Sequence, residues 1–261
     1  MDERVKKIVR KVKIVDVICF TVPGILAVLG MFVDPVTAIM FLFVGYSLTL
    51  FIIRKEYKKG AVNNCLYKKH DPRLAEAVER AIYPKREETD EEKARYDYLA
   101  GDYISALTIK ETTGKHDEIY FASLFEFCNY DSIPRHMNRK VWYKYISEYE
   151  AGNGFKAPLL YAPYMFYYAF GQVKYKFAEY IVNLEIANNK PYWNPERIFA
   201  DMYRKYRRGV TEYMLGKYDE AKADLAPMAA CPKLGASKSA QYYLDKMATS
   251  DKQAEHKRHT E

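Results

Sequence analysis

The chain has 261 residues, of which 49% are hydrophobic and 29% are charged, and its formal net charge is +7. All of the excess positive charge lies in residues 1–70, which hold 12 basic and 5 acidic side chains, whereas residues 71–261 hold 29 of each. Because this charge lies beside the most apolar part of the chain, it suits anionic lipid headgroups and removes the main reason to expect nucleic-acid binding.

Two apolar segments follow the basic N-terminus, at about 15–33 and 36–53. At about 1.5 Å per residue, each forms a helix close to the ~30 Å thickness of the hydrocarbon core of a bilayer. Asp34 and Pro35 separate them, because a carboxylate is costly deep in lipid and proline removes a backbone donor. We therefore predict a transmembrane helical hairpin over 15–54, with Asp34 capping its second helix.

Two other interpretations of this segment are a buried core hairpin and a cleaved signal peptide. A core hairpin normally keeps a polar face, whereas apolar side chains cover all sides of the second helix, 36–53. A signal peptide should be followed by a small-residue cleavage site, whereas here a second apolar segment follows. Both comparisons favour the membrane hairpin.

Basic side chains flank the predicted hairpin on both sides, and its turn contains no lysine or arginine. The positive-inside rule then puts both termini in the cytoplasm, and we expect a two-span protein of the plasma membrane. The basic N-terminus, 1–14, and the juxtamembrane segment, 55–70, are expected to contact anionic lipid headgroups. The residues for this contact are Lys6, Lys7, Arg10, Lys11, Arg54, Lys55, Lys58 and Lys59.

Residues 71–250 have a helical pattern and enough length for one domain with its own core. One apolar helical stripe is formed by Phe199, Met202, Tyr206, Gly209 and Tyr213. No strong strand or hairpin signal occurs, so we expect an all-α fold of nine to eleven helices with short loops. The final segment, 251–261, lacks apolar residues and is expected to be a disordered tail.

The cysteines bear on the redox environment of the chain. They are widely spaced and form no C-x-x-C pair, which is typical of reduced thiols on the cytosolic side. This spacing excludes a disulfide framework and a zinc site. The four residues are Cys19, Cys65, Cys128 and Cys231.

A short pattern, Gly-x-Tyr-x-x-Ala, occurs in segments 100–107 and 215–222. Glycine permits a tight turn between two helices, tyrosine closes the start of the next helix, and alanine lets the helices touch. A further small residue precedes each glycine by seven positions. The packing positions are Ala94, Gly101, Tyr103 and Ala106 in the first copy and Gly209, Gly216, Tyr218 and Ala221 in the second.

This pattern resembles the helix-turn-helix of the tetratricopeptide repeat. The resemblance implies a cytosolic α-solenoid of helix pairs with a concave groove for peptides or partner proteins, and an irregular helical bundle is the alternative. The sequence departs from the family in the spacing of the two copies, which is not a whole multiple of the ~34-residue repeat. The closing proline of the repeat is also absent from the first copy.

Two clusters are candidates for a partner-binding surface. Tyr161, Tyr164 and Tyr168 share one helix face at i, i+3 and i+7, and tyrosine suits recognition because its ring is apolar and its hydroxyl is polar. Their alternative role is packing between repeats. Arg204 and Arg208 also share a face and could hold a carboxylate of a partner.

The alternative for the arginine cluster is a surface ladder of ion pairs. Asp201 and Lys205 are separated by four residues, as are Arg208 and Glu212, and oppositely charged residues at this spacing attract one another on a helix. We favour the ladder for these residues.

Recognised catalytic motifs are missing from the sequence, including H-E-x-x-H, G-x-S-x-G and the phosphate-binding loop. His116, Asp117 and Glu118 form a cluster that could be catalytic, but a charged helix start is the favoured interpretation. We therefore expect no catalytic residue, no metal site and no cofactor.

The predicted function is that of a membrane-anchored protein–protein interaction scaffold at the cytoplasmic membrane face. The partner would be membrane-bound or recruited to the membrane. The alternative is an accessory subunit of a larger membrane complex for transport, secretion or assembly, in which Gly24, Gly30 and Gly45 permit close contact with other helices. A membrane-tethered enzyme is less favoured.

Overall fold

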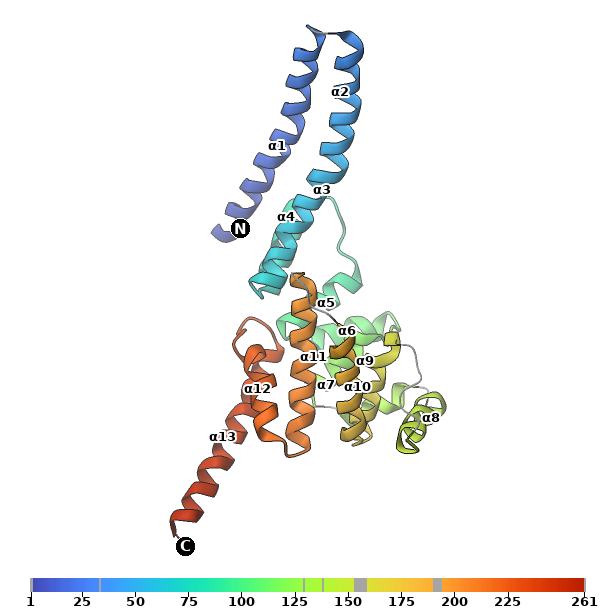
Figure 1. Cartoon of the computed structure of the whole chain (residues 1–261), viewed down its shortest axis with the longest axis vertical. Coiled ribbons are helices and arrows are strands. Elements are labelled where there is room, and N and C mark those ends of the chain that lie inside the picture. Colours follow the sequence, from blue (N-terminus) through green and yellow to red (C-terminus); the bar gives the residue numbers. More distant parts are fainter. Residues whose placement is uncertain are drawn as a thin grey trace. The chain divides into compact units, whose positions relative to one another are not determined.

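The structure is a computed structural model that describes residues 2–32, 34–128, 130–137, 139–152, 159–189 and 194–260. All regular structure in these residues is helical, which confirms the predicted all-α class (Figure 1). The chain forms two compact units, Met1–Glu88 and Thr89–Glu261.

The first unit begins with a long helix, α1, that returns through a turn to a second helical segment lying beside it (Figure 1). Its elements are α1 (Glu3–Met31), α2 (Pro35–Ser47), the π-helical η1 (Leu48–Ile53), α3 (Arg54–Asn63), the π-helical η2 (Asn64–Lys68) and α4 (Pro72–Ile82). The predicted basic N-terminus is thus part of α1. Asp2 caps this helix by accepting a hydrogen bond from the Arg4 amide at 2.8 Å.

The turn between α1 and α2 falls at the predicted position. The Asp34 amide donates to the Gly30 carbonyl at 2.9 Å, and the Asp34 carbonyl accepts from the Ala38 amide at 3.1 Å. Pro35 is the first residue of α2. A backbone amide at this position has no acceptor within the helix, so the missing N–H of proline costs no helical hydrogen bond. A Cβ on Gly30 would lie 3.2 Å from the Ala38 Cα, so this glycine lets the two helices approach closely.

The other two glycines of the hairpin also face its opposite helix. A Cβ on Gly45 would lie 3.3 Å from the Pro23 Cβ, and one on Gly24 would lie 3.7 Å from the Tyr46 hydroxyl oxygen. That hydroxyl donates to the Phe20 carbonyl at 3.1 Å. The small residues are therefore used in packing α1 against α2.

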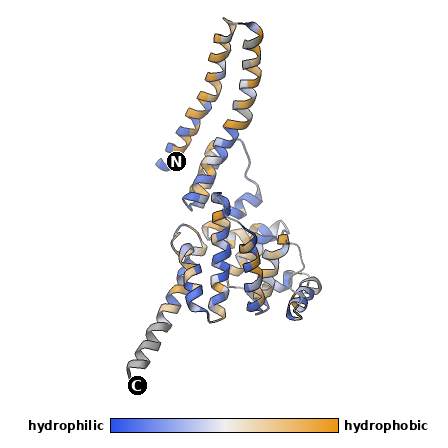
Figure 2. Cartoon of the chain, viewed as in Figure 1, coloured by the Kyte–Doolittle hydropathy of each residue, from blue (hydrophilic) through white to orange (hydrophobic). Residues whose placement is uncertain are grey.

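Helix α1 is long and apolar enough to cross a membrane. Its first part has Val5, Val9 and Val12 buried, at a spacing that places them on one helix face against the rest of the unit. Its later part instead exposes large apolar side chains, and Figure 2 shows hydrophobic residues along both α1 and α2. Those exposed on α1 are Ile14, Val17, Ile18, Phe20, Val22, Ile25, Leu26, Val28, Leu29 and Met31.

Helix α4 belongs to the first unit. The Asp71 side chain caps it by accepting a hydrogen bond from the Leu74 amide at 3.0 Å, and α4 packs against α1 and α3 with Leu74, Ala75 and Val78 buried. From the sequence we expected the cytosolic domain to begin at residue 71. The compact division instead falls after Glu88, because the apolar face of α4 is covered by α1 and α3.

The second unit is built from consecutive helices that pack on their neighbours in the chain. Its elements are α5 (Asp90–Ala100), α6 (Tyr103–Thr112), α7 (Glu118–Glu126), the 3₁₀ helix η3 (Tyr130–His136), α8 (Arg139–Glu150), the 3₁₀ helix η4 (Leu159–Tyr161), α9 (Ala162–Gly171), α10 (Tyr175–Asn188), α11 (Pro195–Met214), α12 (Tyr218–Ala229) and α13 (Ala236–Thr260). Helix α13 thus runs into the segment expected to be a disordered tail, whose side chains lie outside the described residues.

The two copies of the Gly-x-Tyr-x-x-Ala pattern form the same turn. Gly101 and Gly216 both adopt a left-handed conformation, with φ of +86° and +76°, and their amides donate to the carbonyls of Tyr98 and Tyr213 at 3.0 and 3.1 Å. In each copy the tyrosine before the glycine contacts the tyrosine after it, with ring centroids 5.8 Å apart.

The small residues of these two helix pairs lie at helix contacts. Ala94, Ala106 and Ala221 are fully buried, and a Cβ on Gly209 would lie 2.8 Å from the Leu225 Cγ. The α5–α6 and α11–α12 pairs are thus closely packed helical hairpins that share the same glycine turn and small residues at the helix contact.

Candidate functional site

A cavity of about 240 Å³ lies in the second unit, with walls from α5, α7, α9, α10 and α11. Its apolar lining residues are Leu99, Ile119, Ala122, Pro163, Phe199 and Ala200, its tyrosines are Tyr98, Tyr167 and Tyr203, and its charged residues are Glu118, Glu185, Arg204 and Arg207. Two guanidinium groups and two carboxyl groups line a largely apolar cavity. This combination makes the cavity the candidate functional site.

The periodicity of α11 places Arg207 on the helix face that lines this cavity. Phe199, Tyr203 and Arg207 follow one another at intervals of four residues and therefore lie along one face of the helix. On α10, Glu185 continues the buried positions Ile181 and Val182 at the same kind of spacing. Glu185 and Arg207 thus lie on the buried faces of α10 and α11.

Arg207 is 6% exposed and is held from two sides. Its Nη2 donates to the Glu185 Oε2 at 2.8 Å, and its guanidinium carbon lies 5.0 Å from the ring centroid of Phe166 and 5.6 Å from that of Tyr167. Burial disfavours the charge, but the carboxylate of Glu185 raises the pKa of Arg207 above its ordinary value. Arg207 therefore stays charged.

Several buried donor groups on residues that line this cavity have no hydrogen-bond partner. Within the described part of the chain, no hydrogen bond reaches Nη1 of Arg207, Nε and Nη1 of Arg204, or the hydroxyl of Tyr203, and all of these atoms are buried. The nearest carboxylate oxygen to the Arg204 Nε is Oε1 of Glu185, at an ion-pair distance of 4.0 Å. Because a buried donor without an acceptor costs about 1–3 kcal/mol, these groups favour an acceptor inside the cavity.

Glu118 begins α7 and lines the same cavity. Desolvation by the surrounding protein and the carboxylate of Glu185 raise the pKa of Glu118, while Arg207 and Arg204 oppose this change. Glu118 therefore carries less negative charge at a given pH than a free glutamate.

Arg204 and Arg208 were predicted as a pair, but their surroundings in the structure differ. Arg204 lines the cavity, whereas Arg208 is held by Asp224 of α12, with Nη2 at 2.8 Å from Oδ1, and by Asn183 of α10, with Nη1 at 3.0 Å from Oδ1. The structure therefore separates the two residues into a cavity-lining arginine and a helix-pairing arginine.

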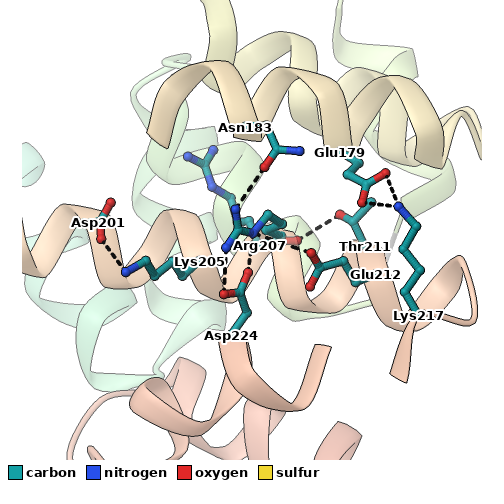
Figure 3. A network of polar contacts seen from close by, with 10 residues as sticks. Glu179, Asn183, Asp201, Lys205, Arg207, Thr211, Glu212, Lys217 and Asp224 are labelled. Carbon is teal, nitrogen blue, oxygen red and sulfur yellow. Dashed lines mark hydrogen bonds and ion pairs between the residues drawn. The ribbon is translucent and has the colours of Figure 1, made fainter. Parts of the chain in front are cut away.

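The ion pairs of the expected ladder are present along α11 (Figure 3). Lys205 lies 3.0 Å from Asp201, and the Arg208 Nε lies 3.6 Å from Glu212. Lys217 extends the network by donating to both carboxylate oxygens of Glu179, at 2.6 and 2.9 Å. This face of α11 is occupied by contacts within the protein.

Two of the three candidate tyrosines line one cavity, and the third is buried in the core. Tyr168 is 2% exposed and belongs to the core. Tyr161 ends η4 and is the N-cap residue of α9. Tyr161 and Tyr164 together line a second cavity of about 440 Å³, which Trp142 and His136 also line.

A buried carboxyl outside the main cavity links three helices. Oε2 of Glu126 on α7 accepts hydrogen bonds from the Tyr206 hydroxyl of α11 and the Ser239 hydroxyl of α13, both at 2.9 Å. Burial raises the pKa of Glu126 to about 7, although the hydrogen bonds from Ser239 and Tyr206 favour its charged form.

Arg207, Glu185 and Tyr203 were not predicted as cavity residues, and Glu118 was considered in a cluster with His116 and Asp117 for which a charged helix start was favoured over a catalytic role. A signal for two of them was present, because Glu185 and Arg207 are charged residues at positions of buried helix faces. A buried charge requires a partner, so each predicts an opposite charge on a neighbouring helix. Within the described residues, no group of three or more His, Cys, Asp or Glu side chains is arranged to hold a metal ion.

Comparison of this chain with protein-family models, with curated proteins and with solved structures gives no match.

Proposed function

We propose that this protein is a membrane-anchored interaction scaffold whose hairpin crosses the plasma membrane twice. The observation that carries this proposal is the exposed apolar surface of the hairpin. It continues from α1 onto α2 and η1 through Val36, Ile39, Met40, Phe43, Val44, Leu48, Ile52 and Ile53. Such a surface is unfavourable in water and favourable in lipid, and α2 with η1 supplies the second span.

The charges at the open end of the hairpin support a cytoplasmic location for both termini. Asp16 of α1 pairs with Arg54 at 2.7 Å and with Lys58 at 3.1 Å, both from α3. This cluster links the two helices where the apolar segments begin and marks the membrane interface. The basic side chains around it, from Lys6 to Lys59, suit the anionic headgroups of the inner leaflet.

The helical unit is the interaction module in this proposal. The identical turns at Gly101 and Gly216 support a tetratricopeptide-like arrangement of helix pairs, and the resemblance to that family implies protein binding rather than catalysis. Anchoring confines the unit to a layer at the membrane, which raises its effective concentration toward other membrane proteins. A partner that is membrane-bound or recruited to the membrane follows from this arrangement.

The accessory-subunit alternative depends on helix contacts outside this chain. Gly24, Gly30 and Gly45 do not favour it, because each faces the opposite helix of the same hairpin. A chimera distinguishes the two functions: residues 15–53 are replaced by an unrelated two-span hairpin, and crosslinking in native membranes identifies the partners. A scaffold keeps its crosslinked partners, whereas an accessory subunit loses them.

Site-directed labelling tests the topology. In a variant whose native cysteines are replaced by alanine, a membrane-impermeant maleimide should label Asp34→Cys in intact cells. The same reagent should label Thr260→Cys only after permeabilisation. Labelling of Thr260→Cys in intact cells would overturn the orientation, and absence of labelling at Asp34→Cys would overturn the second span.

A further inference from the structure

The cavity between α5, α7, α9, α10 and α11 has a more specific chemistry than a scaffold requires. We propose that it binds a small apolar carboxylic acid, about one aromatic ring in size, whose carboxylate is received by the guanidinium groups of Arg204 and Arg207. The proposal concerns the helical unit alone and does not depend on the membrane topology or on a protein partner.

The charge of the ligand follows from the groups that lack a partner. The unpaired atoms are all donors: Nη1 of Arg207, Nε and Nη1 of Arg204, and the hydroxyl of Tyr203, which can also accept. Arg207 is 6% exposed, so bulk water does not satisfy it. Donors on two guanidinium groups match the two oxygens of a carboxylate, and such charge-assisted hydrogen bonds are about twice as strong as neutral ones.

The two guanidinium groups share the carboxylate of Glu185, so Arg204, at 4.0 Å, is less completely paired than Arg207, at 2.8 Å. Glu185 accepts a hydrogen bond from Nη2 of Arg207 at 2.8 Å and therefore neutralises one positive charge of the pair. Glu118 is the remaining acidic group that lines the cavity, and its carboxylate opposes an incoming anion. The sign of the effect of Glu118 on binding is consequently a direct test of the charge of the ligand.

The size and polarity of the ligand follow from the walls. A cavity of about 150 Å³ holds a benzene molecule in another protein, and the present cavity, about 240 Å³, leaves room for one ring and a short acid chain. Tyr98, Phe199 and Tyr203 provide aromatic surfaces, with the rings of Phe199 and Tyr203 only 5.1 Å apart. A ligand with an apolar ring and one carboxylate could contact the aromatic side chains with its ring and the two arginines with its carboxylate.

The experiment is isothermal titration calorimetry of the full chain in lipid nanodiscs, with empty nanodiscs subtracted. The probes are 3-phenylpropanoate, the neutral 3-phenylpropan-1-ol and the cationic 3-phenylpropan-1-amine. The wild type should bind the carboxylate more tightly than the alcohol or the amine. Equal or tighter binding of either other probe, or no binding of the carboxylate, would overturn the proposal and leave a water-filled cavity or another ligand class.

Charge variants locate the binding to this cavity. Arg204→Gln should weaken binding of 3-phenylpropanoate by about tenfold or more, because one charge-assisted hydrogen bond contributes at least that factor. Glu118→Gln should tighten it several fold by removing an opposing carboxylate. Lys205→Gln is the matched control, because Lys205 is the next residue of the same helix, pairs with Asp201 and does not line the cavity.

Equal binding by Arg204→Gln and Lys205→Gln would overturn the assignment of the site. If Arg204→Gln does not fold, as judged by its circular dichroism melt, Tyr203→Phe replaces it, since this change removes only a hydroxyl group. Tyr203→Phe should weaken binding of the carboxylate, and an unchanged affinity would contradict the proposal. A further arm uses the peptide acetyl-Gly-Gly-Phe, and tighter binding of this peptide than of 3-phenylpropanoate would overturn the assignment to a free small acid.

Discussion

Glu126 carries a carboxyl group into the contact between α7, α11 and α13, where Tyr206 and Ser239 donate to it. Its pKa is about 7 in the folded protein, against 4.5 for an ordinary glutamate. Between these values the folded protein keeps a proton that the unfolded chain has released, so the free energy of unfolding falls as pH rises through this window. The hydrogen bonds at Oε2 are retained on both sides of the titration, because an ionised or a protonated carboxyl can accept there.

The predicted loss of stability from this residue between pH 5 and pH 8 is about 2–3 kcal/mol, at about 1.4 kcal/mol per unit of pKa. Glu126→Gln should show a smaller decrease in melting temperature over this range, because its amide oxygen accepts the same hydrogen bonds without titrating. Circular dichroism melts of the full chain in detergent measure this difference. Glu220→Gln, on the exposed face of α12, is the control and should follow the wild type, and an identical pH profile for Glu126→Gln would show that Glu126 does not titrate in this range.

At the scale of helices, the α11–α12 pair depends on two small residues. A Cβ on Gly209 would lie 2.8 Å from the Leu225 Cγ and 3.1 Å from the Asp224 Cβ. Ala221 is fully buried. Gly209→Leu and Ala221→Leu should each overpack this contact and lower stability by about 1–3 kcal/mol. Gly60→Leu is the matched control, because this glycine is also helical but has no atom within 4 Å of a Cβ.

Chemical denaturation of the full chain, followed by circular dichroism, measures these changes. The Gly60 variant should be as stable as the wild type or slightly more stable, since leucine has a higher helix propensity than glycine. Unchanged stability in both α11–α12 variants would mean that this helix pair does not need small residues at its contact, and the repeat-like interpretation of the second copy would lose its physical basis.

At the scale of the whole molecule, the chain divides between Glu88 and Thr89. The linking segment starts after α4 and ends at Thr89, which forms a capping box with Glu92 at the start of α5. Each unit has its own buried residues, so we expect the helical unit to keep its structure when the covalent link is cut.

A specific protease site inserted after Lys85 tests this division in isolated membranes. With the hairpin in the membrane, as proposed above, cleavage should release residues beyond the site into the supernatant with a cooperative helical melt, and the hairpin should stay in the membrane fraction. Protein without the inserted site, treated with the same protease, should remain wholly in the membranes. A released fragment that is unfolded, or a fragment that stays with the membranes, would show that the helical unit depends on the anchor or has a membrane contact of its own.

The sequence alone was sufficient for features that depend on neighbouring residues. It predicted the all-α class, the turn at Asp34 and Pro35, and the ion pair of Lys205 with Asp201, and the structure has all three. A hydrophobic run, a proline at a helix start and a spacing of four residues act within about two helical turns. No knowledge of the tertiary arrangement is needed for such features.

Only the tertiary structure decided which distant residues meet. Arg207 pairs with Glu185 across α11 and α10, and Arg208 is turned toward Asp224 of α12, although both arginines belong to the same short run of charges. Tyr168 is buried in the core rather than displayed with Tyr161. Helical spacing specifies the face on which a side chain lies but not the helix that covers that face, so the cavity and its unpaired donors follow from how the helices pack.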